Sequence, residues 1–198
     1  LLDRFCKNTS YKTEKPNYFT TKYNRQINNI KISIFLVLLT VCSGAFVSGT
    51  NAGWAYNNFP YMGDNLLPPI LLDESLYTIN KLFNDIGFIQ FFHRLLATVT
   101  LIYVLITFFH LFKSKLKAIY FLAALVTVIA ISQYLLGIIM LRLFVPIHLG
   151  LSHQLGSLIL LSSLIVTKCE IIKRRAINRP SFWFRLGKDF KNFFQRKM

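Results

Sequence analysis

Four long apolar segments are the feature of this sequence that most constrains its fold. They lie at about residues 32–48, 87–112, 116–141 and 147–167. A helix needs roughly 20 apolar residues to cross the hydrocarbon core of a bilayer, and backbone in that core must form helices or a closed barrel because no water is there to bond it. We therefore predict an all-α, polytopic membrane protein. Because only short loops separate the second, third and fourth segments, we expect an antiparallel four-helix transmembrane bundle.

The rest of the sequence flanks or interrupts this predicted domain. Residues 1–30 are polar and basic and are predicted to be a linker on the inner side. Residues 31–168 form the transmembrane domain, in which residues 49–86 make an outer loop with the Gly, Asn and Pro that are typical of turns. Residues 169–198 combine basic and aromatic side chains. That pattern fits either an amphipathic helix at the membrane interface or a floppy basic tail.

The basic residues are distributed asymmetrically, which predicts an orientation. The chain has 23 Lys and Arg against 8 Asp and Glu, a net charge of +15. All the basic residues except Lys81, Arg94 and Arg142 lie before the first span, around the loop between the second and third spans, or after the fourth. By the positive-inside rule, both termini then face the matrix or cytoplasm. A nucleic-acid-binding protein would carry its basic patch on a soluble fold, so we expect membrane lipid, and no nucleic acid, as a partner.

Two histidines lie at matching depths in spans that enter the membrane from the outer side. His93 is six residues past Gly87, and His153 is six residues past Ile147. At 1.5 Å per residue, each lies roughly 9 Å below the outer boundary. An ionisable side chain is costly in hydrocarbon and usually functional, and imidazole is a common axial ligand of haem iron. We predict that the two histidines hold one haem between two helices; hydrogen bonding across an ordinary helix contact is the alternative.

Other polar residues of the spans receive separate interpretations. Arg94 needs an anion, and no acidic residue lies inside a predicted span, so we predict that it bonds a haem propionate; snorkelling to the outer headgroups is the alternative. Gln133 is expected to form an interhelical hydrogen bond. Arg142 is expected to be an interface anchor or a second propionate partner. His110 and His148 are expected to be interface or packing residues, with His148 as a reserve ligand.

Several motifs occur together, in order, between about residues 32 and 167. They are a glycine-rich end of the first span, an Ala-Gly…Tyr-Asn-x-Phe-Pro-x-Met-Gly loop, Gln-Phe-x-His-Arg, Gln133…Gly137, Val145-Pro146 and His153-Gln154-x-Gly156-Ser157. As a set they resemble the haem A synthase family, membrane enzymes that mature haem for cytochrome c oxidase. Thr50-Asn51 departs from the Leu-Asp usual in that family. The resemblance covers only the C-terminal four-helix half of a pseudo-symmetric eight-helix fold.

The resemblance implies an oxidoreductase of haem A biosynthesis. His93 and His153 match the axial ligands of the haem b that this half retains, and Arg94 is a cofactor-binding candidate. The group that oxidises the C8 methyl of haem O to the formyl of haem A would belong to the N-terminal four-helix half. That half, haem O and haem A, and an electron donor that the sequence does not identify are the implied partners. No catalytic residue is therefore assigned, and this chain alone is expected to be inactive.

Two other functions stay open on the sequence. One is a stand-alone bis-histidine b-type membrane cytochrome, because bis-histidine ligation leaves no open iron position and suits electron transfer. The other is a haem-free assembly scaffold. We expect the mitochondrial inner membrane, with both termini in the matrix. A bacterial plasma membrane with cytoplasmic termini follows the same orientation rule.

Overall fold

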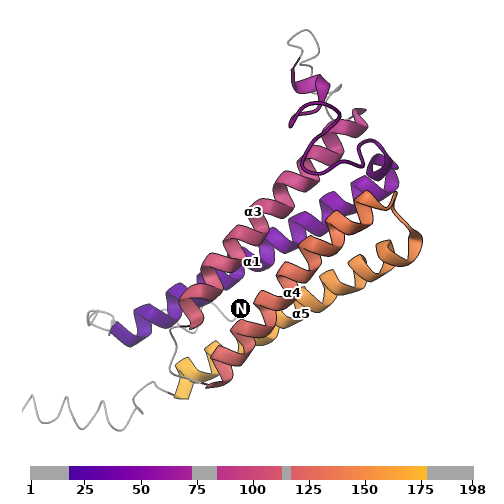
Figure 1. Ribbon diagram of the computed structural model, residues 1–198. Coiled ribbons are helices and arrows are strands. Elements are labelled where there is room, and N and C mark those ends of the chain that lie inside the picture. The colour runs from indigo at the N-terminus through magenta and orange to yellow at the C-terminus, as the bar shows by residue number, and fades with distance from the viewer. Residues whose placement is uncertain (1–17, 73–83, 113–116, 178–198) are drawn as a thin grey trace, which may run out of the picture.

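The computed structural model describes residues 18–72, 84–112 and 117–177, and these contain four long helices (Figure 1). The long helices are α1 (Tyr18–Gly49), α3 (Ile86–Phe112), α4 (Lys117–Arg142) and α5 (Ile147–Ile177). Two short 3-10 helices, η2 (Ala52–Trp54) and η3 (Pro69–Leu71), follow α1. All four long helices have the length and hydropathy needed to cross a membrane. The predicted all-α, polytopic membrane bundle is confirmed.

The first helix is longer than predicted at its beginning. We interpreted residues 18–30 as part of a linker, but they are helical, since α1 spans Tyr18–Gly49. Tyr23, Ile27 and Ile30 recur at the spacing of one helical face, and the two isoleucines are buried in the core with Tyr23 packed against it. The linker prediction is therefore wrong for these residues, and residues 1–17 lie outside the described part of the chain.

The last helix is longer than predicted at its end. The fourth span was expected to stop near Thr167, but α5 continues to Ile177. The reason is packing, because Ile171 lies one turn beyond Thr167 and both side chains are fully buried. The amphipathic helix considered for the tail falls mainly on residues 178–198, outside the described ranges.

The four helices form one antiparallel bundle in which each packs against two neighbours (Figure 1). The order around the bundle is α1, α3, α4, α5, so α3 and α5 are diagonally opposite. The segment 50–72 and the turn between α4 and α5 lie at one end, which we call the loop end. The start of α1 and the end of α5 lie at the far end. The two helices that carry the predicted ligands, α3 and α5, both begin at the loop end.

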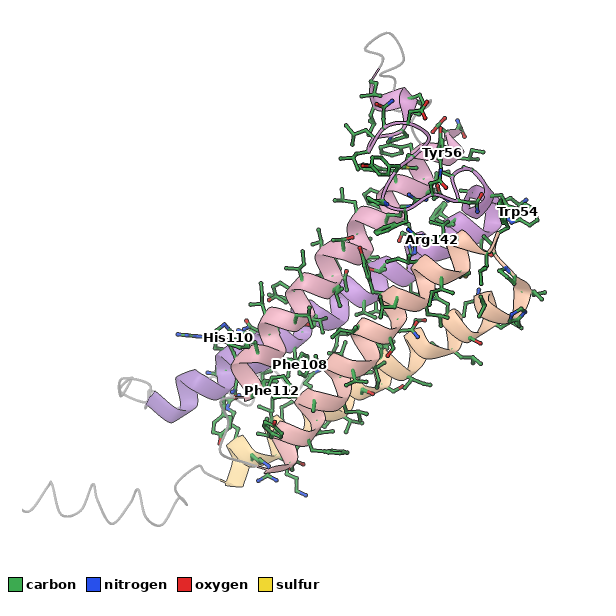
Figure 2. The ribbon with its side chains drawn as sticks, viewed as in Figure 1. Trp54, Tyr56, Phe108, His110, Phe112 and Arg142 are labelled. Atoms are coloured by element: carbon green, nitrogen blue, oxygen red, sulfur yellow. The ribbon has the colours of Figure 1, made fainter. Side chains whose placement is uncertain are left out.

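The far end of the bundle is filled by apolar side chains. Each helix contributes an interior line of residues three or four apart, which is one helical face. The buried residues on these lines include Ile30, Val104, Phe108, Val126 and Leu164, and Figure 2 shows Phe108 and Phe112 in this region. Lipid tails are as apolar as these side chains, so van der Waals packing, rather than the hydrophobic effect, holds the helices together there.

The turn between α4 and α5 has a strained backbone. Phe144 (φ 59°) and Val145 (φ 54°) both have left-handed conformations, which cost roughly 1–2 kcal/mol for a residue other than glycine. Val145 packs against η2, since a Cβ atom placed on Gly53 would lie 3.2 Å from its Cγ2. The strained turn therefore brings α4 and α5 into contact with the segment that follows α1.

A pair of glycine substitutions tests the strain at this turn. Phe144→Gly is expected to cost less stability than Leu143→Gly, by about 1–2 kcal/mol, because only position 144 has a positive φ that glycine adopts freely. The side chains are comparably exposed, 65% for Phe144 and 56% for Leu143, so each variant loses similar surface contacts. Unfolding of the detergent-solubilised protein measures the difference. Equal costs for the two variants would contradict strain at position 144.

Candidate cofactor site

Toward the loop end, the residues that face the interior of the bundle become smaller, more polar and less buried. On α3, the line that is fully buried at Val104 and Phe108 is only partly buried at Ala97 and His93. The other three helices change in the same way, with small or polar, partly exposed residues on their interior lines: Thr40 and Gly44, Gln133 and Gly137, His153 and Ser157. Side chains fill the far end of the bundle to interior density. Around the two histidines the interior lines instead carry small, polar and partly exposed residues.

Each histidine ring lies against a glycine of the neighbouring helix. A Cβ atom placed on Gly44 of α1 would lie 3.2 Å from Cε1 of His93. A Cβ atom placed on Gly137 of α4 would lie 3.2 Å from Cε1 of His153. Any side chain at either glycine would therefore press on an imidazole. We call these two close approaches the glycine notches.

The two histidine–glycine pairs are arranged alike. Helices α1 and α3 form one antiparallel pair and α4 and α5 form the other; in each, the first helix supplies the glycine and the second the histidine. Thr40 lies four residues before Gly44, and Gln133 lies four residues before Gly137. The main-chain carbonyls of Thr40 and Gln133 interact with the rings of His93 and His153, respectively. The four-helix unit thus contains a repeated local arrangement around its two histidines.

The two imidazoles approach each other but differ in their hydrogen bonds. They lie within electrostatic range of each other. Nδ1 of His93 is 2.8 Å from Oγ of the buried Ser43 on α1. Nδ1 of His153 is buried and has no hydrogen-bond partner within the described ranges. Ser43, which directly precedes Gly44, is a residue of this site that we did not predict.

Gln133 has a different environment from the one we predicted. Its carboxamide lies against Gly156 of α5, so closely that no side chain could replace the glycine hydrogen without moving the glutamine. Its Oε1 is buried and has no hydrogen-bond partner among the described residues. Within the described residues, Oε1 therefore does not form the interhelical hydrogen bond that we predicted for Gln133. Instead, Gln133 occupies the space beside Gly156, one turn below His153.

Arg94 binds the segment between α1 and α3. Its Nη1 donates to the main-chain carbonyls of Asn58 and Tyr61, both at 3.2 Å, and its Nη2 donates to the carbonyl of Tyr56 at 2.6 Å. Nη2 also donates to Oε1 of Gln90 at 3.3 Å. We expected Arg94 to need an anion, and no acidic residue lies in a predicted span. Main-chain carbonyl oxygens of the loop accept its hydrogen bonds instead. Nε of Arg94 is buried without a hydrogen-bond partner in the described part of the chain, and the propionate contact stays a prediction.

Three further side chains fasten the same segment to the helices. Nε2 of Gln90 donates to the carbonyls of Gly53 and Tyr56. Asn57 Nδ2 donates to the carbonyl of Leu141 at 2.8 Å. Arg142 Nη2 donates to the carbonyl of Phe59 at 3.1 Å, and Figure 2 shows this arginine at the loop end with Tyr56 and Trp54. The loop therefore covers the end of the bundle that contains the two histidines.

The other two histidines lie apart from this site. His110 is exposed near the far end of α3, where Figure 2 shows it projecting away from the bundle, and its ring forms an edge contact with Phe109. His148 is exposed in the first turn of α5. Both positions fit the interface role that we expected.

The donor set suits a haem. Across residues 18–72, 84–112 and 117–177, no group of three or more His, Cys, Asp and Glu side chains could hold a metal ion. A porphyrin supplies four nitrogen ligands itself, so two imidazoles complete the coordination of its iron. The glycine notches and the small residues around them fit a group of this kind.

The fold and the site define a class of protein, a four-helix membrane bundle with two interior histidines on diagonally opposite helices beneath a fastened loop. Residues 10–165 match the profile of the cytochrome oxidase assembly protein family. This match covers well over half of the chain, which therefore belongs to that family. It confirms the family resemblance that the motifs predicted.

Proteins named haem A synthase are among the relatives of this chain. The one from Wolbachia sp. subsp. Brugia malayi (strain TRS) is 35% identical over 148 residues, which cover 75% of this chain and 42% of the relative. That of Mus musculus is 40% identical over 129 residues, or 64% of this chain and 31% of the relative. That of Rickettsia prowazekii (strain Madrid E) is 36% identical over 134 residues, or 68% and 40%. The chain thus matches less than half the length of these relatives. No solved structure matches it significantly.

Proposed function

We propose that this chain is the haem-b-binding half of a haem A synthase, with His93 and His153 as the axial ligands of the iron. The observation that carries the proposal is the placement of the two imidazoles, on the diagonally opposite helices α3 and α5, each set in a glycine notch toward the loop end of the bundle. Imidazoles from diagonally opposite helices suit the two axial positions of one iron.

The residues of this chain would hold and shield the cofactor. His93 and His153 would bind the iron, Gly44 and Gly137 would leave room for the rings, and the buried Nε of Arg94 would be available to a propionate oxygen. A haem bound by two imidazoles supplies electron transfer, because no iron position is open. The loop fastened by Gln90, Arg94 and Arg142 would keep water from the site.

The complete reaction would need more than this chain. In the proposal, oxidation of the haem O C8 methyl to the formyl of haem A requires an N-terminal four-helix half, either on a separate chain or in the same protein, and the present chain alone is inactive. The lengths of the relatives support this, since the chain matches 31–42% of the three compared above.

We also propose a location and an orientation. Within the described ranges, every Lys and Arg except Arg94 and Arg142 lies toward the far end, so the positive-inside rule favours that end in the matrix. The proposed location is therefore the mitochondrial inner membrane with both termini in the matrix. Relatives occur in both animals and bacteria, so a bacterial plasma membrane with cytoplasmic termini is the alternative.

Absorbance of the purified protein tests the ligand assignment. The detergent-solubilised chain is expected to show a Soret band and the spectrum of a low-spin b-type haem. His93→Ala and His153→Ala should each lower the haem content per protein at least tenfold, because each removes one iron ligand. His110→Ala is the matched control and should retain the band, since His110 is exposed at the far end. Retention of the band in both ligand variants would place ligation elsewhere.

Co-expression separates the proposed half-enzyme from its rivals. Haem A extracted only from cells that express both this chain and an N-terminal four-helix half supports the proposal. A reversible haem redox signal without haem A in any combination would indicate a stand-alone membrane cytochrome. A wild-type protein without a Soret band, even after addition of haem, would indicate a haem-free assembly scaffold.

A further inference from the structure

We infer that Ser43 is a positioning residue for His93 and that the two histidines are inequivalent ligands, an inference that rests on the proposed function. The Ser43 hydroxyl carries one hydrogen, which Oγ donates to the main-chain carbonyl of Thr40 at 2.8 Å. Because the Thr40 carbonyl can only accept, we assign the serine oxygen as the acceptor in its other contact, 2.8 Å from Nδ1 of His93. His93 is thus held with a hydrogen on Nδ1 and a free lone pair on Nε2.

This tautomer is the one that a metal-binding imidazole needs when it binds through Nε2. The hydrogen bond made by one ring nitrogen determines which nitrogen is left for the metal. A partner at the second nitrogen also fixes the ring orientation and raises the basicity of the ligand. Ser43 is buried and bonds both the α1 backbone and the α3 imidazole. It therefore prepares His93 for ligation before any cofactor is bound.

His153 lacks an equivalent partner. In the α4–α5 pair, Gly137 takes the place of Gly44, and the residue before it is Leu136 where the first pair has Ser43. A leucine side chain cannot accept a hydrogen bond. Nδ1 of His153 is accordingly buried without a hydrogen-bond partner in the described part of the chain.

The surroundings of the two rings share two features, although Arg94 acts on His93 alone. In both pairs a main-chain carbonyl four residues before the glycine interacts with the ring, that of Thr40 for His93 and that of Gln133 for His153. Both rings also meet their glycine at the same distance. We therefore expect His93 to be the oriented, more basic ligand and His153 the weaker one.

Exchanging the hydroxyl between the two pairs tests this inference. Ser43→Ala removes the acceptor from His93, Leu136→Ser supplies one to His153, and the double variant moves it from one ligand to the other. Ser43→Thr keeps a hydroxyl at the same carbon and should behave as wild type. Ser162→Ala is the matched control, because its hydroxyl bonds only the carbonyl of Leu158 on an exposed face of α5.

The first readout is the midpoint potential of the bound haem. A more basic axial imidazole favours ferric iron, so Ser43→Ala should lower the ferric-over-ferrous preference about threefold to tenfold. At 59 mV per tenfold for one electron, the potential rises by about 30–60 mV. Leu136→Ser should shift it in the opposite direction, and the double variant should return it toward the wild-type value. The Ser162→Ala potential should equal that of wild type.

The second readout is the ¹⁵N spectrum of labelled histidine in the haem-free protein. Ser43→Ala should shift His93 toward the tautomer protonated at Nε2, and Leu136→Ser should shift His153 toward the one protonated at Nδ1. The inference is overturned if Ser43→Ala and Ser162→Ala give the same histidine ring spectrum in the haem-free protein. An unchanged midpoint potential in Ser43→Ala would show that Ser43 does not tune the bound haem. If wild type binds no haem, the proposed function fails, while the ring spectrum still decides whether Ser43 orients His93.

Discussion

Gly137→Leu is expected to abolish haem binding while leaving the helical bundle intact. Even the first carbon of a side chain at this position would lie 3.2 Å from Cε1 of His153, and leucine adds three more carbons. Overpacking of this kind displaces neighbouring side chains at a cost of about 1–3 kcal/mol. A displaced imidazole would not keep the axial position that we propose for it. The haem content, measured from the Soret absorbance per protein, should fall at least tenfold, within the range seen when metal ligands lose their support.

Two variants complete this experiment. Gly44→Leu should have the same effect through His93, because the two notches have the same dimensions. Gly49→Leu is the control, since a Cβ atom at Gly49 would meet nothing within 4 Å, and it should retain haem. Normal haem content in both notch variants would show that the imidazoles do not need the space that the glycines leave.

Arg94→Met is expected to release the loop that covers the site. The substitution keeps an apolar chain of similar length but removes the donors to three loop carbonyls. Hydrogen bonds from charged groups contribute about 1.5–3 kcal/mol each. Because this guanidinium is partly exposed, we expect a combined loss on the order of 2 kcal/mol, well below their sum. Hydrogen exchange of the Met62 amide, whose N–H donates to the Asn65 carbonyl, should accelerate about thirtyfold, since 1.4 kcal/mol corresponds to a factor of ten.

Arg142→Met is the matched control for loop release. Arg142 donates to one loop carbonyl, that of Phe59, at 3.1 Å. Arg142→Met should therefore accelerate exchange of the loop amide several-fold less than Arg94→Met does. Arg94→Lys should resemble Arg94→Met, because an ammonium group lacks the planar fork that reaches several carbonyls. Unchanged exchange in Arg94→Met would show that the other anchors suffice to hold the loop.

Much of the fold could be predicted from the sequence because a membrane-spanning helix requires a long apolar segment, which is easily recognised. The beginning of α3 differs from the prediction by one residue, since the charged loop residues mark where the apolar run starts. The beginning of α1 was missed because Tyr23, Ile27 and Ile30 form a sparse apolar line among Asn, Lys and Thr. Only contact with the other helices shows that this line is buried.

The site could be predicted in part. The histidines stood out because each is an ionisable side chain within an apolar run, and the structure brings them close enough to interact. Ser43 was missed because serine is common in membrane helices, and nothing in the sequence shows which neighbouring helix it faces. The partners of Arg94 were missed for another reason, since they are main-chain carbonyls, which every residue carries.

The contrast between the two ends of the bundle bears on how such a protein matures. Side chains such as Phe108 and Leu164 close the far end completely, so the helices can assemble in the bilayer before any prosthetic group arrives. The loop end is covered instead by a segment held through hydrogen bonds to main-chain carbonyls, and none of these bonds belongs to that packing. Under the proposed function, insertion of the chain and loading of its cofactor would therefore be successive events, with the cofactor entering a scaffold that is already built.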